Sequence, residues 1–206
     1  MAEQLQRALD IARLALAFGE VDRATAHPDG RPETDTTHTV MLALLAGELA
    51  ELEVENLWTF NPRDVVALAL VHDLVETFAG DTCTARGLTP EQAQVKEVRE
   101  AAARQRIREL LGESSWVVRI LDRYEAQETH EARFVRYLDK ITPKLTHVLN
   151  GGRALRAIGM TFTEMRAKHE EQSAALAQQY PEFKATRALF DEACRLAEER
   201  CEVPRG

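Results

Sequence analysis

Helix-starting signals recur along the whole chain, and they constrain its fold more than any other feature of the sequence. Asn61-Pro62 places a capping residue before a proline, which is well tolerated at the first position of a helix. The stretch Thr89-Pro90-Glu91-Gln92 combines the same proline signal with a capping box. Thr129 precedes another apolar helical pattern. No stretch alternates apolar and polar residues clearly enough to predict a strand. We therefore expect an all-α protein.

Apolar periodicity between the glycines and prolines gives the expected helices. The chain opens with Leu5, Leu9 and Leu16 at helical spacing. Residues 24–35 contain two prolines and a glycine and are expected to form a loop. Further helices are expected over residues 35–52, 61–76, 89–111, 114–126, 129–150, 163–179 and 182–200. The pattern predicts an irregular bundle of about seven to nine helices in one domain, residues 1–206.

The chain is acidic, with a formal net charge of -8 over 206 residues. This charge repels a polyphosphate backbone, so a nucleic-acid polymer is not expected as a partner. The three cysteines, Cys83, Cys194 and Cys201, form no CxxC pair and predict no disulfide framework. No apolar run is long enough to span a membrane, and the N-terminus lacks the pattern of a signal peptide. These features predict a cytoplasmic protein without a membrane partner.

The most informative place in the sequence is the end of the helix expected over residues 61–76. The helix is apolar nearly all round, which predicts burial, yet it ends in His72, Asp73 and Glu76. Burying such groups without partners is costly. Since residues three or four apart share a helix face, Glu76 is expected beside the other two. A histidine that caps a helix end at the surface would also explain a bare His-Asp pair.

Two further residues make a metal site the better interpretation. His38 lies early in an otherwise apolar helix, and Asp139 lies in the apolar stripe of a later one. Alone, His38 would be read as a core histidine and Asp139 as an ion-pair partner of Lys140 or Lys144. Together with the His-Asp pair they supply two imidazoles and two carboxylates from three helices. Such a mixed set suits an octahedral divalent ion with positions open to water and substrate.

The order of a histidine, a His-Asp pair and a distant aspartate resembles the HD-domain phosphohydrolases. His72-Asp73-Leu74-Val75-Glu76 followed by Gly80-Asp81 is similar to the HDxxE…GD stretch of the 5′-deoxynucleotidase branch. Residues 124–126 and 131–140 resemble its later block, and residues 37–39 match its first-histidine region more loosely. The resemblance covers roughly residues 15–150, which we expect to be the metal-binding core. It implies that the metal ligands are His38, His72, Asp73 and Asp139.

Roles for three more residues follow from the same resemblance. Glu76 and Asp81 occupy positions that the family uses for catalysis and substrate positioning; their alternatives are a solvated helix-end charge and a turn residue. Arg23 precedes His38 by the separation at which the family places a phosphate-contacting arginine. Its alternative is a surface arginine paired with a nearby acid. Lys96 and Lys140 are weaker candidates for the phosphate contact.

One divalent ion is expected rather than two. Two-metal members of the wider superfamily use additional histidines. His147 lies about 12 Å along a helix from Asp139, too far to join the cluster. The remaining histidines also include His130, His169 and His27, which is in the expected loop and could reach the site. Mn²⁺, Co²⁺, Fe²⁺, Ni²⁺, Zn²⁺ and Mg²⁺ all stay open as the native ion.

The chain departs from the 5′-deoxynucleotidase pattern at one point. A tryptophan follows soon after the phosphate arginine in that branch, whereas residues 24–28 after Arg23 contain none here; Trp58 and Trp116 lie elsewhere. Phe18, Phe78 or His27 could replace that ring, or the nucleoside is bound differently. We expect a phosphomonoesterase of nucleoside 5′-monophosphates. The alternatives are a nucleoside triphosphohydrolase and a non-catalytic metal-bound regulatory or dimerisation module.

The oligomeric state depends on the C-terminal helices. The family is often dimeric, and these helices present an apolar face that includes Phe183, Leu189 and Phe190. That face could form a homodimer contact, or it could pack on the chain's own core. The expected partners are thus a small phosphorylated substrate and a possible second copy of the chain.

Overall fold

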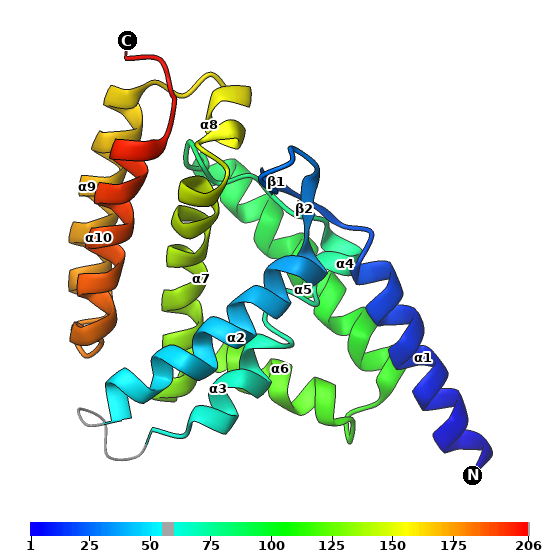
Figure 1. Ribbon diagram of the computed structural model, residues 1–206. Helices are drawn as coiled ribbons and strands as arrows, with labels where there is room; N and C mark the ends of the chain where they lie inside the picture. The colour runs from blue at the N-terminus through cyan, green and yellow to red at the C-terminus, as the bar shows by residue number, and fades with distance from the viewer. Residues whose placement is uncertain (55–59, 206) are drawn as a thin grey trace.

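The protein is a helical bundle built around one long central helix, as a computed structural model that describes residues 1–54 and 60–205 shows (Figure 1). Within these residues there are ten helices and one small hairpin. The helices are α1 (Ala2–Phe18), α2 (Asp35–Val54), α3 (Pro62–Ala69), α4 (Glu76–Ala79), α5 (Pro90–Leu111), α6 (Trp116–Ala126), α7 (His130–Leu149), α8 (Arg153–Ala157), α9 (Phe162–Gln179) and α10 (Lys184–Arg200). The all-α prediction is confirmed. Trp58 lies outside the described residues.

The capping signals of the sequence act as predicted. The Asn61 side chain accepts a hydrogen bond from the Arg63 amide at the start of α3. Thr89 and Gln92 form a reciprocal capping box at the start of α5, and Thr129 accepts from the Ala132 amide at the start of α7. These bonds satisfy amide donors that the first helical turn leaves without partners. The caps therefore fix where three of the helices begin.

The helix predicted over residues 61–76 is broken. It ends at Ala69, and residues 70–75 form tight turns before α4 begins at Glu76. In a continuous helix the Ala69 carbonyl would accept from the amide of Asp73. Here it lies 2.8 Å from the Nδ1 of His72 instead. The His72 side chain thus competes with the helix for this acceptor. The turn splits the predicted helix in two, and α8 was not predicted. The described residues therefore contain ten helices, whereas about seven to nine were expected.

The loop predicted over residues 24–35 contains a β-hairpin. Strand β1 (Asp22–Ala26) pairs antiparallel with β2 (Pro32–Thr34), and Asp22 lies opposite Thr34. The turn between them contains Gly30 at a φ of +92°, a conformation that glycine adopts at little cost. Strands this short carry too few residues to produce a recognisable alternation. The hairpin places Arg23 beside the start of α2.

Helix α7 forms the centre of the core. Its Phe134, Leu138 and Ile141 are buried, and it packs against α2, α3, α6 and α10. The Phe134 ring contacts the Phe183 ring with a centroid separation of 5.0 Å. Phe183 and Phe190 are both fully buried, so this C-terminal face packs on the chain's own core. It therefore gives no support to a homodimer, which stays a prediction.

The C-terminal segment closes a second, smaller core beside α8. Cys201 and Val203 pack with Leu155, Met160 and Met165. Gly152 permits this approach, because a Cβ added there would lie 2.7 Å from the Cβ of Cys201. No helix in the described part of the chain is long and apolar enough to cross a membrane. The two cores flank the residues that form the candidate site.

Candidate metal centre and its cavity

His38 enters the site from the first turn of α2. Its side chain is almost fully buried, and its Nε2 lies 3.0 Å from Oδ1 of Asp139. On the other side of the ring, Nδ1 lies 3.7 Å from Oε1 of Glu33, which is itself buried. Thr25 donates its hydroxyl to the other Glu33 oxygen. A carboxylate behind an imidazole is the usual arrangement for orienting a metal-binding histidine.

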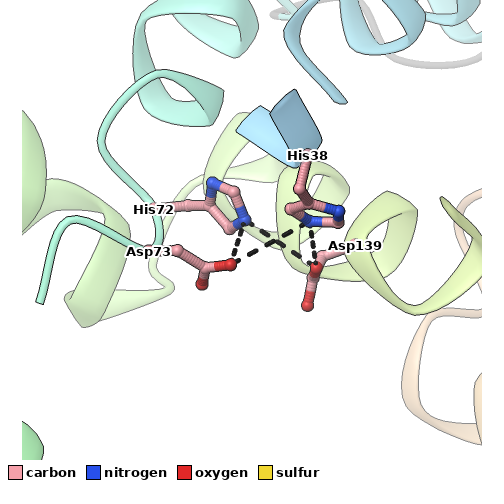
Figure 2. Close-up of side chains that lie close together, drawn as sticks. All are labelled: His38, His72, Asp73 and Asp139. Atoms are coloured by element: carbon pink, nitrogen blue, oxygen red, sulfur yellow. Dashed lines mark hydrogen bonds and ion pairs between the residues drawn. The ribbon is translucent and has the colours of Figure 1, made fainter. Parts of the chain in front are cut away.

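His72 and Asp73 enter from the turn that follows α3. The contact between His72 Nδ1 and the Ala69 carbonyl holds the ring in place, so that Nε2 points toward Asp73 and Asp139. Asp139 comes from α7, one residue after the buried Leu138. Three separate segments therefore meet at one point, as the sequence predicted for the four residues (Figure 2).

The four side chains form a tight cluster of potential ligand atoms. His72 Nε2 lies 2.9 Å from Asp73 Oδ2 and 3.7 Å from Asp139 Oδ1, and His38 Nε2 lies 3.9 Å from Asp73 Oδ2. One atom from each residue falls within 4.8 Å of all the others. A divalent ion with bonds of about 2.1 Å separates its ligand atoms by roughly 3 to 4 Å. The spacing therefore fits one ion.

A buried nitrogen without a hydrogen-bond partner is a second, independent indication that the site fits a metal. His72 Nε2 is buried and has no hydrogen-bond partner among the described residues, although Asp73 is close. A buried polar atom without a partner is unfavourable unless a ligand completes its contacts. Two imidazole nitrogens and two carboxylate oxygens are a donor set suited to a first-row divalent ion. The residues present therefore fit a metal.

The close approach of the histidines and carboxylates shifts the pKa values of the cluster residues. Burial opposes protonation of His72, but the neighbouring Asp73 and Asp139 outweigh it and raise the pKa of His72 to about 10. Burial works against ionisation of Asp73, but His72 and Arg23 lower the pKa of Asp73 to about 2. The pKa of Asp139 is held well below its ordinary value by the two histidines, again against burial. The cluster is thus organised around opposite charges at close range.

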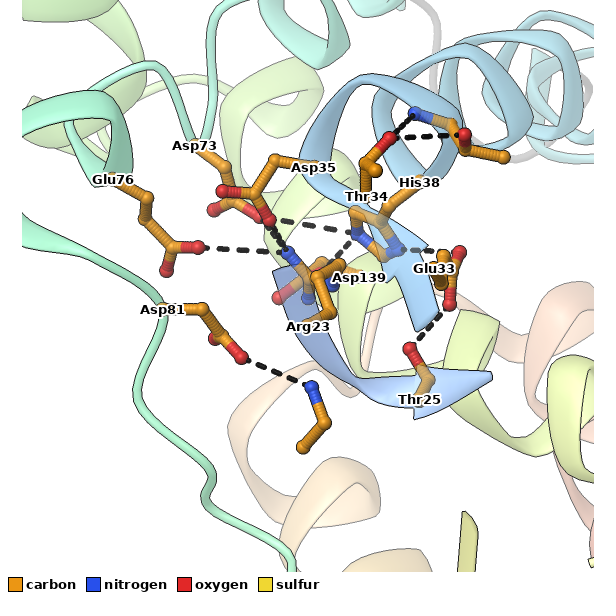
Figure 3. Close-up of polar contacts among 12 residues, drawn as sticks. Arg23, Thr25, Glu33, Thr34, Asp35, His38, Asp73, Glu76, Asp81 and Asp139 are labelled. Atoms are coloured by element: carbon orange, nitrogen blue, oxygen red, sulfur yellow. Dashed lines mark hydrogen bonds and ion pairs between the residues drawn. The ribbon is translucent and has the colours of Figure 1, made fainter. Parts of the chain in front are cut away.

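Arg23, the predicted phosphate contact, reaches the metal centre from β1 (Figure 3). Its Nη1 donates to Asp35 and Asp73, with both distances 2.8 Å, and lies 3.6 Å from Glu76. No hydrogen bond within the described chain uses its Nε or Nη2, and the residue lines the adjoining cavity. One corner of the guanidinium is therefore anchored while the remaining donors stay available to a ligand.

Glu76 and Asp81 lie on the same side of the centre. Glu76 begins α4, is buried, and its Oε2 has no hydrogen-bond partner among the described residues. Burial and the nearby Asp73, Asp35 and Asp81 raise the pKa of Glu76 to about 10. Asp81 follows Gly80 in the loop after α4, and its Oδ2 accepts the amide of Ala24 on β1. The structure thus brings both predicted carboxylates to the site.

Two contributors were not found from the sequence. Asp35 is fully buried and binds Arg23, yet an aspartate that begins a helix reads as an ordinary cap. Glu33 supports His38 only because β2 folds back onto β1, and the hairpin itself was not predicted. Asp35, Asp73 and Glu76 form a second acidic group that could hold a cation, and Arg23 occupies it.

The other candidates are not part of the ligand cluster, although Lys140 lines the adjoining cavity. Lys96 pairs with Glu100 on α5, and Lys140 is exposed beside Asp139. His27 is in the hairpin turn and joins none of the metal-binding groups found among the described residues. Phe18 is a core residue, and Phe78 packs under Arg106. None of His27, Phe18 and Phe78 lines the cavity beside the metal centre, so none of them replaces the missing tryptophan there.

A cavity of about 210 Å³ opens beside the metal centre. Arg23, Asp81 and Asp139 line one end of it. One wall is apolar and comes from α8 and the segment that leads into α9, with Leu155, Ile158 and Met160. Such a mixture of an apolar wall and a few convergent polar groups is typical of small-molecule sites. The cluster therefore borders a partly open cavity, which Asp139 reaches directly.

Comparisons with known proteins find relatives whose names state a nucleotidase activity. The chain is 32% identical over 112 residues to 5′-deoxynucleotidase HDDC2 of Homo sapiens, a match that covers 53% of this chain and 50% of that protein. HDDC2 of Mus musculus is 30% identical over 53% of this chain and 52% of its own length. The chain therefore spans about half the length of the curated relatives it matches.

A solved structure matches over nearly the whole chain. It is the crystal structure of a predicted metal-dependent phosphohydrolase from Magnetospirillum magnetotacticum MS-1, with a TM-score of 0.71 and 29% sequence identity. The match covers 94% of this chain and 97% of that one. The HD domain family matches residues 19–181, which hold the ligand cluster, the cavity and most of the bundle. This chain belongs to the HD domain family and resembles its metal-dependent phosphohydrolases.

Proposed function

We propose that this protein is a metal-dependent phosphomonoesterase that acts on nucleoside 5′-monophosphates. The observation that carries the proposal is the meeting of His38, His72, Asp73 and Asp139 beside a cavity that Asp139 and Arg23 line. The matched relatives named 5′-deoxynucleotidase and metal-dependent phosphohydrolase support the same reaction class.

Metal binding is assigned to the four clustered residues. A divalent ion held there supplies Lewis acidity toward a phosphoryl oxygen. Glu33 and the Ala69 carbonyl orient the two imidazoles, so their ligand nitrogens face the same point. Preorganised groups of this kind lower the reorganisation needed during the reaction. We propose a single ion, because the cation of Arg23 already neutralises the second acidic group.

The phosphate contact is assigned to Arg23. Asp35 and Asp73 hold its Nη1, which leaves Nε and Nη2 as a planar pair of donors toward the cavity. Such a fork matches two phosphate oxygens better than a lysine ammonium does. The anchoring carboxylates also limit the motion of the side chain. Arg23 thus positions the phosphate between itself and the metal ligands.

Proton handling is assigned to Glu76 and Asp81. Hydrolysis of a phosphomonoester requires a group that orients the attacking water and a group that protonates the leaving oxygen. Glu76 lies 3.6 Å from the Arg23 guanidinium, and Asp81 lines the cavity next to β1. Both carboxylates are therefore near the position assigned to the phosphate. We assign these two roles to this pair jointly.

The nucleoside is assigned to the cavity. No tryptophan lines it among the described residues; its apolar wall is aliphatic, with Leu155, Ile158 and Met160. An aliphatic wall excludes water from a base or sugar face without a stacking ring. We therefore expect weaker discrimination between deoxyribose and ribose than a site with an aromatic contact would give.

Product analysis tests the proposal. Purified protein is incubated with deoxynucleoside and ribonucleoside 5′-monophosphates and with nucleoside triphosphates, each with Mn²⁺, Co²⁺ or Mg²⁺. Release of orthophosphate from monophosphates, lost in Asp139→Asn, supports the proposal. Release of triphosphate or pyrophosphate would instead identify a triphosphohydrolase. Turnover of no substrate by protein that retains its metal would favour a non-catalytic module.

A further inference from the structure

The end of the cavity farthest from the metal centre is formed by two helices that face each other with basic and polar side chains. Lys144 and His147 come from α7, and Lys168 and Gln172 come from α9. We call these four residues the far lobe. The two on each helix are three or four residues apart and so share a face. None of them has a role in the proposed reaction.

Lys144 is the central residue of the far lobe. Its side chain is only 8% exposed, and no carboxylate lies within ion-pair distance of it in the described part of the chain. Burial and the nearby Lys168 lower the pKa of Lys144. A buried ammonium without an anion is unfavourable, because it loses its hydration and gains no partner. The far lobe therefore contains a buried positive charge that an anionic ligand would compensate.

Two further side chains in the far lobe lack partners. His147 is 7% exposed, and its Nδ1 is buried without a hydrogen bond among the described residues. Burial, together with Lys144 and His169, lowers the pKa of His147 to about 3, so the neutral ring keeps one N–H donor. The side-chain amide oxygen of Gln172 is also buried without a partner. These groups offer hydrogen bonds around the ammonium.

The charges along the cavity separate into two ends. Its carboxylates are Asp81 and Asp139, both at the metal centre. At the other end, Lys168 pairs with the largely exposed Glu171, which leaves the charge of Lys144 uncompensated.

We propose that the far lobe binds a second anionic group of the substrate, a phosphate or a carboxylate, through Lys144 with His147, Lys168 and Gln172. This inference rests on the proposed function, since it extends the same cavity. Lys144 and His147 follow Asp139 by five and eight residues on α7, which corresponds to about 8 to 12 Å along the helix. The preferred substrate is thus a phosphomonoester whose second anion lies about this far from the scissile phosphate.

A series of doubly charged phosphate esters tests the inference. Ethanediol through hexanediol bisphosphates serve as inhibitors of deoxynucleoside monophosphate hydrolysis, each compared with the alkyl monophosphate of equal chain length. Titration calorimetry on metal-loaded protein measures the same binding without turnover. We expect at least one bisphosphate to bind tenfold or more tightly than its matched monophosphate. In Lys144→Met that ratio should fall to about one.

The control variant is Lys184→Met, which removes the same charge from an exposed position at the start of α10. Its ratio should equal that of the wild type. Analogues with a phosphate at one end and a carboxylate at the other then tell a carboxylate preference from a phosphate preference. Thermal unfolding of each variant shows whether the fold is retained.

The outcomes separate this inference from the proposed function. If monophosphates are hydrolysed but no bisphosphate or carboxylate analogue binds better than its matched monophosphate, the far lobe is not an anion site and the function stands. If Lys144→Met leaves the ratio of bisphosphate to monophosphate affinity unchanged, the far lobe is likewise not an anion site. If no phosphomonoester is hydrolysed while a bisphosphate binds through Lys144, the reaction is wrong and the anion site stands.

Discussion

His72 donates its Nδ1 proton to the carbonyl oxygen of Ala69, three residues earlier, over 2.8 Å. A carbonyl can only accept, so this bond places the proton on Nδ1 and leaves the lone pair of a neutral ring on Nε2. The same bond ends α3 and turns Asp73 toward the centre. One contact therefore selects the tautomer, orients the ring and breaks the helix.

Loss of a ligand should remove the metal. We expect His72→Ala and Asp73→Ala to retain less than about a tenth of the metal bound by wild-type protein, since weakening even a supporting contact costs 10- to 100-fold in affinity. Elemental analysis by mass spectrometry measures the content. His130→Ala, which changes an exposed histidine at the start of α7, is the matched control and should keep full occupancy. Full metal content in both ligand variants would exclude this site.

Glu33 should matter to metal binding although it is no ligand. Its carboxylate lies 3.7 Å from His38 Nδ1 and is buried, so it holds the ring from behind. Glu33→Gln should weaken metal binding by about 10- to 100-fold. Competition with a chelator of known affinity gives the constant. Glu20→Gln, an exposed change just before β1, should leave it as in the wild type. An unchanged affinity in Glu33→Gln would show that His38 is oriented by other contacts.

The sequence predicted the ligand cluster because it marked the residues, but it did not predict how they meet. His38, His72, Asp73 and Asp139 stood out as ionisable groups in apolar surroundings, and all four converge. The helix predicted over residues 61–76 was wrong after Ala69, because the His72 side chain uses the Ala69 carbonyl as its acceptor. Periodicity describes helix faces and cannot register a single competing hydrogen bond of this kind.

The periodic pattern of α1 shows a second limit. Leu5, Leu9 and Leu16 predicted the helix correctly, yet they are exposed, and Leu14 and Phe18 are the buried residues. Likewise, Asp35 and Glu33 gained their roles only through the β1–β2 hairpin, which places Arg23 and Thr25 against them. Contacts between segments that lie apart in the sequence leave no periodic signal. The sequence therefore predicts which residues form helices or sites better than it predicts which residues contact one another.

Arg23→Lys should keep the stability of the fold better than Arg23→Ala does, but it should still weaken substrate binding. Alanine leaves the buried Asp35 without its cation, which should lower the free energy of unfolding by about 3–5 kcal/mol. Lysine keeps the charge but loses the donor fork, so KM for a nucleoside monophosphate should rise about tenfold. Denaturant unfolding and steady-state kinetics measure the two effects. A wild-type KM in Arg23→Lys would remove Arg23 from the phosphate site and return attention to Lys140.

Glu76 and Asp81 should affect turnover more than binding. Glu76→Gln and Asp81→Asn keep the size of each side chain but remove a proton donor or acceptor, so kcat should fall by about 10²- to 10⁴-fold. KM should change much less, because loss of transition-state stabilisation alone lowers kcat. Glu97→Gln, exposed on α5, is the control. If one of the two site variants keeps full turnover, its partner carries the proton transfer.

The buried His147 should make the fold sensitive to acid. Burial, with help from Lys144 and His169, lowers the pKa of His147 to about 3, whereas an unfolded histidine titrates near 6.5. Between these values the unfolded state binds the proton and the folded state does not. The contribution of His147 is therefore fully present above pH of about 6.5 and is lost as pH falls toward 3.

The slope of stability against pH measures this effect. We expect the free energy of unfolding of wild-type protein to fall by up to about 1.4 kcal/mol more per pH unit than that of His147→Leu between pH of about 6 and 4. Chelator is present throughout, so metal binding contributes to neither protein. His130→Leu, an exposed change on the same helix, should keep the wild-type slope. Equal slopes in wild type and His147→Leu would mean that the folded protein accepts the proton on His147 and leaves it accessible to water.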